Sequence, residues 1–199
     1  MCLNGFAESL APGGLMSKAQ RQVVLVSGAP GAGKSTLAGP LAAELGFALL
    51  AKDRIKETLA GTLGDGAGEL TCSRRLGAAS MELLWALAAD APAVVLEANF
   101  WPGDDRHERH LRKLDAHAVE VHCACPLAVA MRRYSERRAS RHVAHAEAHR
   151  DVSPEAWAKW ARPVGLGDLV SVDTSAPVDI ACLACEVRAK LDASPEAVH

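Results

Sequence analysis

The stretch GAPGAGKST, residues 28–36, decides the fold of this chain. It matches the pattern G-x-x-x-x-G-K-[ST] and stands between an apolar run, residues 22–27, and a stretch of helical spacing, residues 34–45. Glycines at these positions let backbone N–H groups turn toward phosphate oxygens, and the following helix N-terminus adds partial positive charge. The loop therefore predicts a nucleoside triphosphate site. Its predicted members are Gly28, Ala29, Pro30, Gly31, Ala32, Gly33, Lys34, Ser35 and Thr36.

Two side chains of this loop have predicted roles toward ATP and Mg²⁺. We expect Lys34 to reach the β- and γ-phosphates and the Ser35 hydroxyl to coordinate Mg²⁺. The alternative is a glycine-rich turn that matches by chance, and the strand–loop–helix context argues against it. No N-K-x-D guanine motif follows, which excludes an ordinary GTPase, and 199 residues leave little room for the lid domain of an AAA+ motor.

Strand-like and helix-like segments alternate from this loop to the C-terminus. The predicted strands cover residues 22–27, 47–51, 93–96, 119–123 and 169–172. The predicted helices cover residues 34–45, 54–59, 71–89, 104–116, 126–141, 153–162 and 177–191. Such alternation predicts a three-layer α/β P-loop NTPase fold, with about five parallel strands flanked by helices and a small arginine-rich lid. Gly39-Pro40 inside the first helix predicts either a kink or a tolerated proline.

We expect one domain over residues 21–192, with a lid at about residues 132–152. Residues 1–20 contain no basic start followed by an apolar stretch and are predicted to be a disordered tail, with Met16 as a second candidate start. Residues 193–199 are predicted to fray.

Composition narrows the function classes. The chain has 49% hydrophobic residues and a net charge of −2, which argue against a disordered protein and against a broad basic surface for nucleic acid. Six irregularly spaced cysteines fit a reducing cytoplasm better than a disulfide scaffold. No apolar run approaches the roughly 20 residues of a transmembrane helix.

Residues 28–56, GAPGAGKSTLAGPLAAELGFALLAKDRIK, resemble the start of the P-loop kinases related to polynucleotide kinase and chloramphenicol phosphotransferase, of the AAA_33 type. The resemblance implies that Asp53 is the general base for the acceptor hydroxyl; its alternative is the N-cap of the helix beginning at Arg54. Lys56 is a candidate for binding an acidic group of the acceptor, with solvated surface as its alternative.

The segment VVLEANF, residues 94–100, resembles the third strand and following loop of the same kinases. The resemblance implies that Glu97 holds a Mg²⁺-bound water, although the family often carries aspartate there; a structural hydrogen bond is the alternative. Asn99 is a candidate for the metal or acceptor side. Trp101 is a candidate for packing on an acceptor ring, with a core or hinge role as its alternative.

The basic run PLAVAMRRYSERRASR, residues 126–141, resembles the lid of these kinases. The resemblance implies that Arg133 and Arg137 close over the transferring phosphoryl group as catalytic residues. We expect Arg132 and Arg138 to face solvent. An exposed basic helix and an RNA-contacting patch are the alternatives.

Two further groups carry open predictions. Asp173 and Thr174, in the segment LVSVDT, either lie beside the adenine, as the resemblance implies, or cap the last helix. The histidines of the lid are expected to be solvated, with a zinc site or a contact to acceptor or γ-phosphate as alternatives. These histidines are His142, His145 and His149.

The predicted function is transfer of the γ-phosphoryl group of Mg·ATP to a hydroxyl of a small-molecule acceptor, with antibiotic, nucleoside and sugar hydroxyls all open. A 5′-hydroxyl polynucleotide kinase is one alternative; it would need a positive channel from the arginine run. A regulatory module that hydrolyses ATP slowly is the other.

Overall fold

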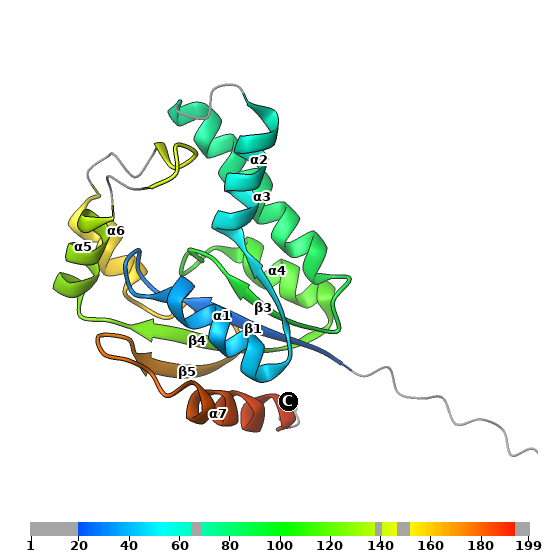
Figure 1. Ribbon diagram of the computed structural model, residues 1–199. Helices are drawn as coiled ribbons and strands as arrows, with labels where there is room; N and C mark the ends of the chain where they lie inside the picture. Colours follow the sequence, from blue (N-terminus) through cyan, green and yellow to red (C-terminus); the bar gives the residue numbers. More distant parts are fainter. Residues whose placement is uncertain (1–19, 65–68, 138–140, 147–151, 194–199) are drawn as a thin grey trace, which may run out of the picture.

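A computed structural model of the chain describes residues 20–64, 69–137, 141–146 and 152–193 (Figure 1). Five parallel strands form a single sheet in the order β2-β3-β1-β4-β5. The strands are β1 Arg21–Ser27, β2 Ala48–Ala51, β3 Ala93–Glu97, β4 Ala116–Ala124 and β5 Asp168–Asp173. The predicted fold class is confirmed.

Helices connect the strands and cover both faces of the sheet, which gives three layers (Figure 1). They are α1 Lys34–Leu45, α2 Lys52–Leu63, α3 Leu70–Ala88, α4 Asp105–Leu114, α5 Leu127–Glu136, α6 Pro154–Trp160 and α7 Ile180–Asp192. None of the described helices is long and apolar enough to cross a membrane.

The central strand β1 divides the core into two halves. Its residues alternate between the faces: Val24 and Val26 pack with α1 and α7, whereas Val23 and Leu25 pack with α3 and α4. All four side chains are buried, as expected for a strand with helices on both sides. Because the strands are parallel, their carboxyl ends meet at one edge, and this edge carries the site described below.

Of the differences from the predicted helices, the start of α2 and the end of α5 matter most for the site, and the proline inside α1 has a definite outcome. Helix α1 runs through Pro40, and Gly39 has no Cβ to clash with the proline ring, so the proline is tolerated. Helix α2 begins at Lys52, two residues before the predicted start. Helix α5 ends at Glu136, so the predicted helix up to Arg141 is wrong in its last part.

The predicted disordered tail falls on residues outside the description, apart from Gln20. The same holds for the predicted fraying of residues 193–199, apart from Ala193. Of the predicted lid, residues 132–137, 141–146 and 152 are described.

Candidate active site

The glycine-rich loop joins β1 to α1 and has a backbone that requires glycine. Gly28, Gly31 and Gly33 have φ values of 130°, 85° and 94°, in the region that side chains rarely adopt. A Cβ on Gly31 would lie 2.1 Å from the carbonyl oxygen of Ala130 in α5. The loop is therefore a cradle whose shape a single added methyl group would destroy.

Lys34 lies inside this cradle. Its ammonium group donates hydrogen bonds to the carbonyl oxygens of Gly28 (2.8 Å) and Ala29 (3.0 Å). Burial lowers the pKa of Lys34, and the nearby carboxylate of Glu97 opposes that shift. A buried cation at the N-terminus of α1 suits an anionic phosphate chain.

Ser35 and Glu97 meet at the carboxyl end of β3. The Ser35 hydroxyl donates to Oε1 of Glu97 over 3.3 Å, because strands β1 and β3 pair in parallel with Val26 opposite Glu97. Burial raises the pKa of Glu97, while Lys34 and the Ser35 hydrogen bond act in the opposite direction. A hydroxyl and a carboxylate supply the oxygen ligands that Mg²⁺ prefers. The described residues hold no cluster of three His, Cys, Asp or Glu side chains for a metal, so remaining ligands would have to come from phosphate and water.

Asp53 is the second residue of α2 and does not cap it. The N-cap is Ala51, so the N-cap alternative is wrong. Oδ2 of Asp53 lies 3.0 Å from Nη2 of Arg141, and Oδ1 lies 3.5 Å from Nζ of Lys52. Burial alone would raise the pKa of Asp53, but Lys52, His145 and Arg141 together hold it below its usual value. The carboxylate is therefore ionised at neutral pH.

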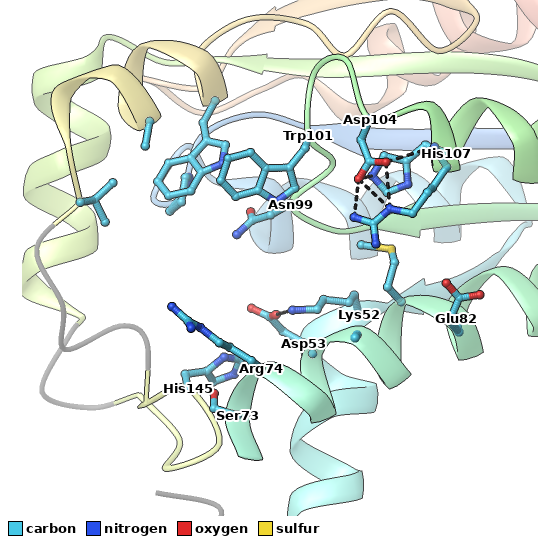
Figure 2. A pocket seen from close by; sticks show the side chains of 18 of the residues that line it. Lys52, Asp53, Ser73, Arg74, Glu82, Asn99, Trp101, Asp104, His107 and His145 are labelled. Atoms are coloured by element: carbon cyan, nitrogen blue, oxygen red, sulfur yellow. Dashed lines mark hydrogen bonds and ion pairs between the residues drawn. The ribbon is translucent and has the colours of Figure 1, made fainter. Parts of the chain in front are cut away.

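Two adjoining cavities meet at Asp53. A cavity of about 310 Å³ contains the glycine-rich loop together with Lys34, Ser35 and Glu97. A second cavity, of about 580 Å³, extends between α3 and the loop after β3 (Figure 2). The lining residues common to both are Pro30, Asp53, Asn99, Tyr134 and Arg141. This arrangement brings Asp53 and Asn99 to the boundary between a phosphate cradle and an acceptor-sized space.

A third cavity, of about 640 Å³, lies on the other side of the glycine-rich loop and is lined by Gly33, Thr36 and Thr174. Oγ1 of Thr174 is buried and has no hydrogen-bond partner among the described residues. Asp173 accepts a hydrogen bond from the Ser175 N–H, and the N-cap of α7 is Asp179. Capping of the last helix by Asp173 or Thr174 is therefore wrong.

The arginines of the basic run separate in space. Arg133 donates to the carbonyl oxygens of Thr174 (2.9 Å) and Ser175 (3.0 Å) and lines the third cavity. Arg133 is not among the residues that line the loop cavity, which contradicts the prediction that it closes over the transferring phosphoryl group. Arg137 and Arg141 line that cavity. Sequence reasoning missed Arg141; its only signal was the basic run, because the helix that would have set its direction ends at Glu136.

Lys56 is fully buried, which contradicts the solvated alternative. Its ammonium donates to Ser73 Oγ (2.9 Å), and that hydroxyl donates to the Ala144 carbonyl (2.6 Å). Lys56 lines neither the loop cavity nor the second cavity. This contradicts the prediction that Lys56 binds an acidic group of the acceptor. The three residues join α2, α3 and the segment 141–146.

The histidines do not gather around a metal in the described part of the chain. His145 is buried, with Nε2 2.9 Å from Oε1 of Glu57, so its predicted solvation is wrong. His142 is exposed, and its Nδ1 accepts from the N–H of Ala144. His149 lies outside the described residues.

Trp101 lies in the wall of the second cavity. Its ring centroid is 5.0 Å from that of Trp160 in an edge-to-face arrangement, and 39% of the residue is exposed. Asn99 lies beside it, toward the loop cavity (Figure 2). Two of the three predicted acceptor-side residues, Asn99 and Trp101, thus line the cavity that adjoins Asp53, whereas Lys56 does not.

Comparisons with known proteins agree with this geometry. The family model of the AAA domain matches residues 23–163. A structure of a provisionally assigned kinase from Chloroflexus aurantiacus J-10-fl is 28% identical, with a TM-score of 0.72, over 86% of this chain and 99% of that one. No curated protein matches the chain.

Two further solved structures share the fold. The APS kinase CysC of Mycobacterium tuberculosis, in complex with AMPPNP and APS, is 20% identical, with a TM-score of 0.55, over 87% of this chain and 99% of that one. An unliganded sugar kinase from Janibacter sp. HTCC2649 is 18% identical, with a TM-score of 0.55, over 88% and 96%.

Proposed function

Because the chain belongs to the AAA domain family of the AAA_33 type and has the fold of P-loop kinases, we propose that it transfers the γ-phosphoryl group of ATP to a hydroxyl of a small-molecule acceptor. The observation that carries this proposal is the place of Asp53. Its carboxylate lies where the cavity of the glycine-rich loop joins the 580 Å³ cavity.

The chemistry follows from the side chains around this boundary. The acceptor oxygen forms a bond to the γ-phosphorus, the bond from that phosphorus to the bridging oxygen of ADP breaks, and Asp53 accepts the hydroxyl proton. Lys34 and the loop N–H groups bind the phosphate charge. Arg137 and Arg141 stabilise the charge that develops on the transferred group.

Ser35 and Glu97 are the residues that would hold Mg²⁺, Glu97 through a water molecule. When bound, the ion neutralises negative charge on the phosphates. Thr174 would contact the nucleotide from the third cavity. We further propose that residues 21–192 work as one domain with a lid at about residues 132–152. The cytoplasmic location stays a prediction from cysteine usage.

The test is ADP release from Mg·ATP, with and without pooled hydroxyl acceptors such as antibiotics, nucleosides, sugars and short 5′-hydroxyl oligonucleotides. We expect one small-molecule pool to raise turnover and Asp53→Asn to lower the stimulated rate by about 10²-fold or more. Asp90→Asn, on an exposed residue after α3, is the matched control. A rate indifferent to every pool would favour the regulatory module, and stimulation by oligonucleotides alone would favour the polynucleotide kinase.

A further inference from the structure

The 580 Å³ cavity has a chemical character that narrows the acceptor class. We infer that the acceptor carries an anionic group, a carboxylate or phosphate, bound by Arg74, and a flat apolar body held between Trp101 and helix α3. This inference rests on the proposed function, because it treats the cavity beside Asp53 as the acceptor site.

One face of α3 lines the cavity over most of the helix length. Its lining residues follow helical spacing: Ser73, Arg74, Gly77, Ala78, Met81, Glu82 and Trp85. The facing wall carries Asn99, Trp101 and Asp104 from the segment after β3 (Figure 2). A molecule in this space would touch α3 on one side and the ring of Trp101 on the other.

The charged side chains of the cavity are mostly paired with one another. Arg106 binds Asp104 through Nε (2.9 and 3.1 Å) and Nη2 (2.6 Å). Arg141 and Lys52 both lie beside Asp53. These contacts neutralise Arg106 beside the segment after β3 and the cations at the boundary with the loop cavity.

Arg74 differs from these cations. Among the described residues it makes no hydrogen bond or ion pair, and Figure 2 shows its side chain extending into the cavity near His145. A guanidinium group presents a planar fork of donors that matches a carboxylate or phosphate. A guanidinium that no described residue pairs, on the wall of the proposed acceptor cavity, therefore favours an acceptor with an anionic group.

Trp101 and Gly77 indicate a flat body. Trp101 lines the cavity and is partly exposed, a position that favours stacking or apolar contact. Gly77 stands inside α3, where glycine is less favourable than alanine. A Cβ there would meet Lys52 Nζ and Lys56 Nζ at 3.8 Å, an ordinary contact, and no positive φ requires glycine. The absence of a side chain instead leaves space in the cavity.

The first test measures binding to the full chain in the presence of Mg·AMPPNP by calorimetry. The probes are 4-(hydroxymethyl)benzoate, its uncharged amide 4-(hydroxymethyl)benzamide, 4-(hydroxymethyl)phenylphosphonate and 4-(hydroxymethyl)cyclohexanecarboxylate. We expect an anionic aromatic probe to bind at least tenfold more tightly than the amide, with the benzoate-to-phosphonate ratio identifying the anion. The benzoate should also bind more tightly than the non-planar cyclohexane compound.

Arg74→Gln should reduce the preference for the anionic probe to within about twofold, and Arg75→Gln, the adjacent exposed arginine outside the cavity lining, should leave it unchanged. Equal affinity of wild type for charged and uncharged probes, or an unchanged preference in Arg74→Gln, overturns the inference. Selective binding without stimulated ADP release for any probe would instead overturn the proposed function. Stimulation by an uncharged acceptor, undiminished in Arg74→Gln, would leave the function standing and remove the inference.

Gly77→Ala tests the flat body separately. Alanine should raise the melting temperature, because it favours the helix, and should weaken binding of the aromatic probe several-fold by filling the cavity. The rise in melting temperature shows that the variant folds. Unchanged or tighter binding in this variant would overturn the place assigned to the apolar body.

Discussion

Arg141 and Asp53 form an ion pair at the boundary of the two cavities, with Nη2 of the arginine 3.0 Å from Oδ2 of the aspartate. The residue proposed to accept the hydroxyl proton is therefore paired with a cation that also lines the loop cavity. A triphosphate in that cavity would compete with Asp53 for the guanidinium group. Phosphate binding would thereby loosen the ion pair that Arg141 makes with Asp53, the proposed general base.

The two arginines Arg141 and Arg133 should give different kinetic defects. Arg141→Gln should lower kcat by about 10²-fold or more, as expected for loss of a group that stabilises transition-state charge. Arg133→Gln should mainly raise KM for ATP, because Arg133 holds the Thr174 and Ser175 carbonyls beside the third cavity. Steady-state kinetics against ATP measures both, and Arg132→Gln, on an exposed arginine, is the control. A large kcat loss in Arg133→Gln with a normal Arg141→Gln would restore the role that the sequence predicted.

The pH dependence of stability should reveal the charges around Asp53. Its folded-state pKa is lowered, so the ionised carboxylate stabilises the fold above the ordinary aspartate pKa of about 3.9, and this contribution is lost as pH falls through the lowered value. Asp53→Asn should therefore reduce the melting temperature at pH 7 and approach wild type in acid. A gap between the two proteins that widens in acid would contradict the lowered pKa.

Glu97 should behave in the opposite sense. Burial raises its pKa, so ionisation costs stability once pH exceeds the ordinary glutamate pKa of about 4.3. Glu97→Gln should raise the melting temperature at pH 7, with a smaller difference near pH 4. The same variant should lose about 10- to 100-fold in Mg²⁺-dependent turnover, because a ligand partner is gone. A destabilised variant with normal Mg²⁺ dependence would assign Glu97 a structural hydrogen bond alone.

Gly31 should tolerate no side chain. A Cβ there would lie 2.1 Å from the Ala130 carbonyl oxygen at a φ of 85°, so Gly31→Ala must displace the loop from α5. We expect loss of ATP binding by calorimetry and a lower melting temperature. Gly61→Ala is the control, because a Cβ on this α2 glycine meets nothing within 4 Å. It should stabilise the protein by about 0.5–1 kcal/mol, and normal ATP binding in Gly31→Ala would contradict the cradle.

Glu120 should contribute strongly to the free energy of unfolding. Sequence patterns did not identify this residue. Its buried carboxylate accepts hydrogen bonds from the N–H groups of Val164, Gly165 and Leu166 and from the Ser27 hydroxyl. Glu120→Gln should cost about 2–3 kcal/mol in urea unfolding, because hydrogen bonds to a charged group are lost.

The control for Glu120 is Glu108→Gln. Glu108 is exposed and lies 3.4 Å from Arg112 on the same helix, so its loss should change the free energy of unfolding by about 0.5 kcal/mol or less. Equal effects of the two substitutions would show that the buried carboxylate network does not hold the segment after α6.

Local sequence patterns were enough for the fold and for one half of the site. The glycine-rich loop, the β-branched run before it and the alternation of elements are short-range signals, and they predicted the parallel sheet. The resemblance to the P-loop kinases implied site roles for Asp53, after β2, and Glu97, at the end of β3, and because parallel strands end at one edge, both residues line the loop cavity.

The other half depended on contacts between distant segments. The segment 141–146 is positioned by Ser73 and Glu57, about 70 to 90 residues away in the sequence. The local sequence pattern therefore does not predict the direction that the chain takes after α5. Lys56 carries a charge that suggests a surface, yet packing of α2 against α3 buries it. The proposed acceptor cavity is likewise bounded by α3, the segment after β3 and α6. Sequence alone determined the proposed phosphate site, since the backbone conformation of the glycine-rich loop makes that cradle. The tertiary structure decided which arginines and which walls surround the proposed acceptor site, since side chains from separate elements make that space.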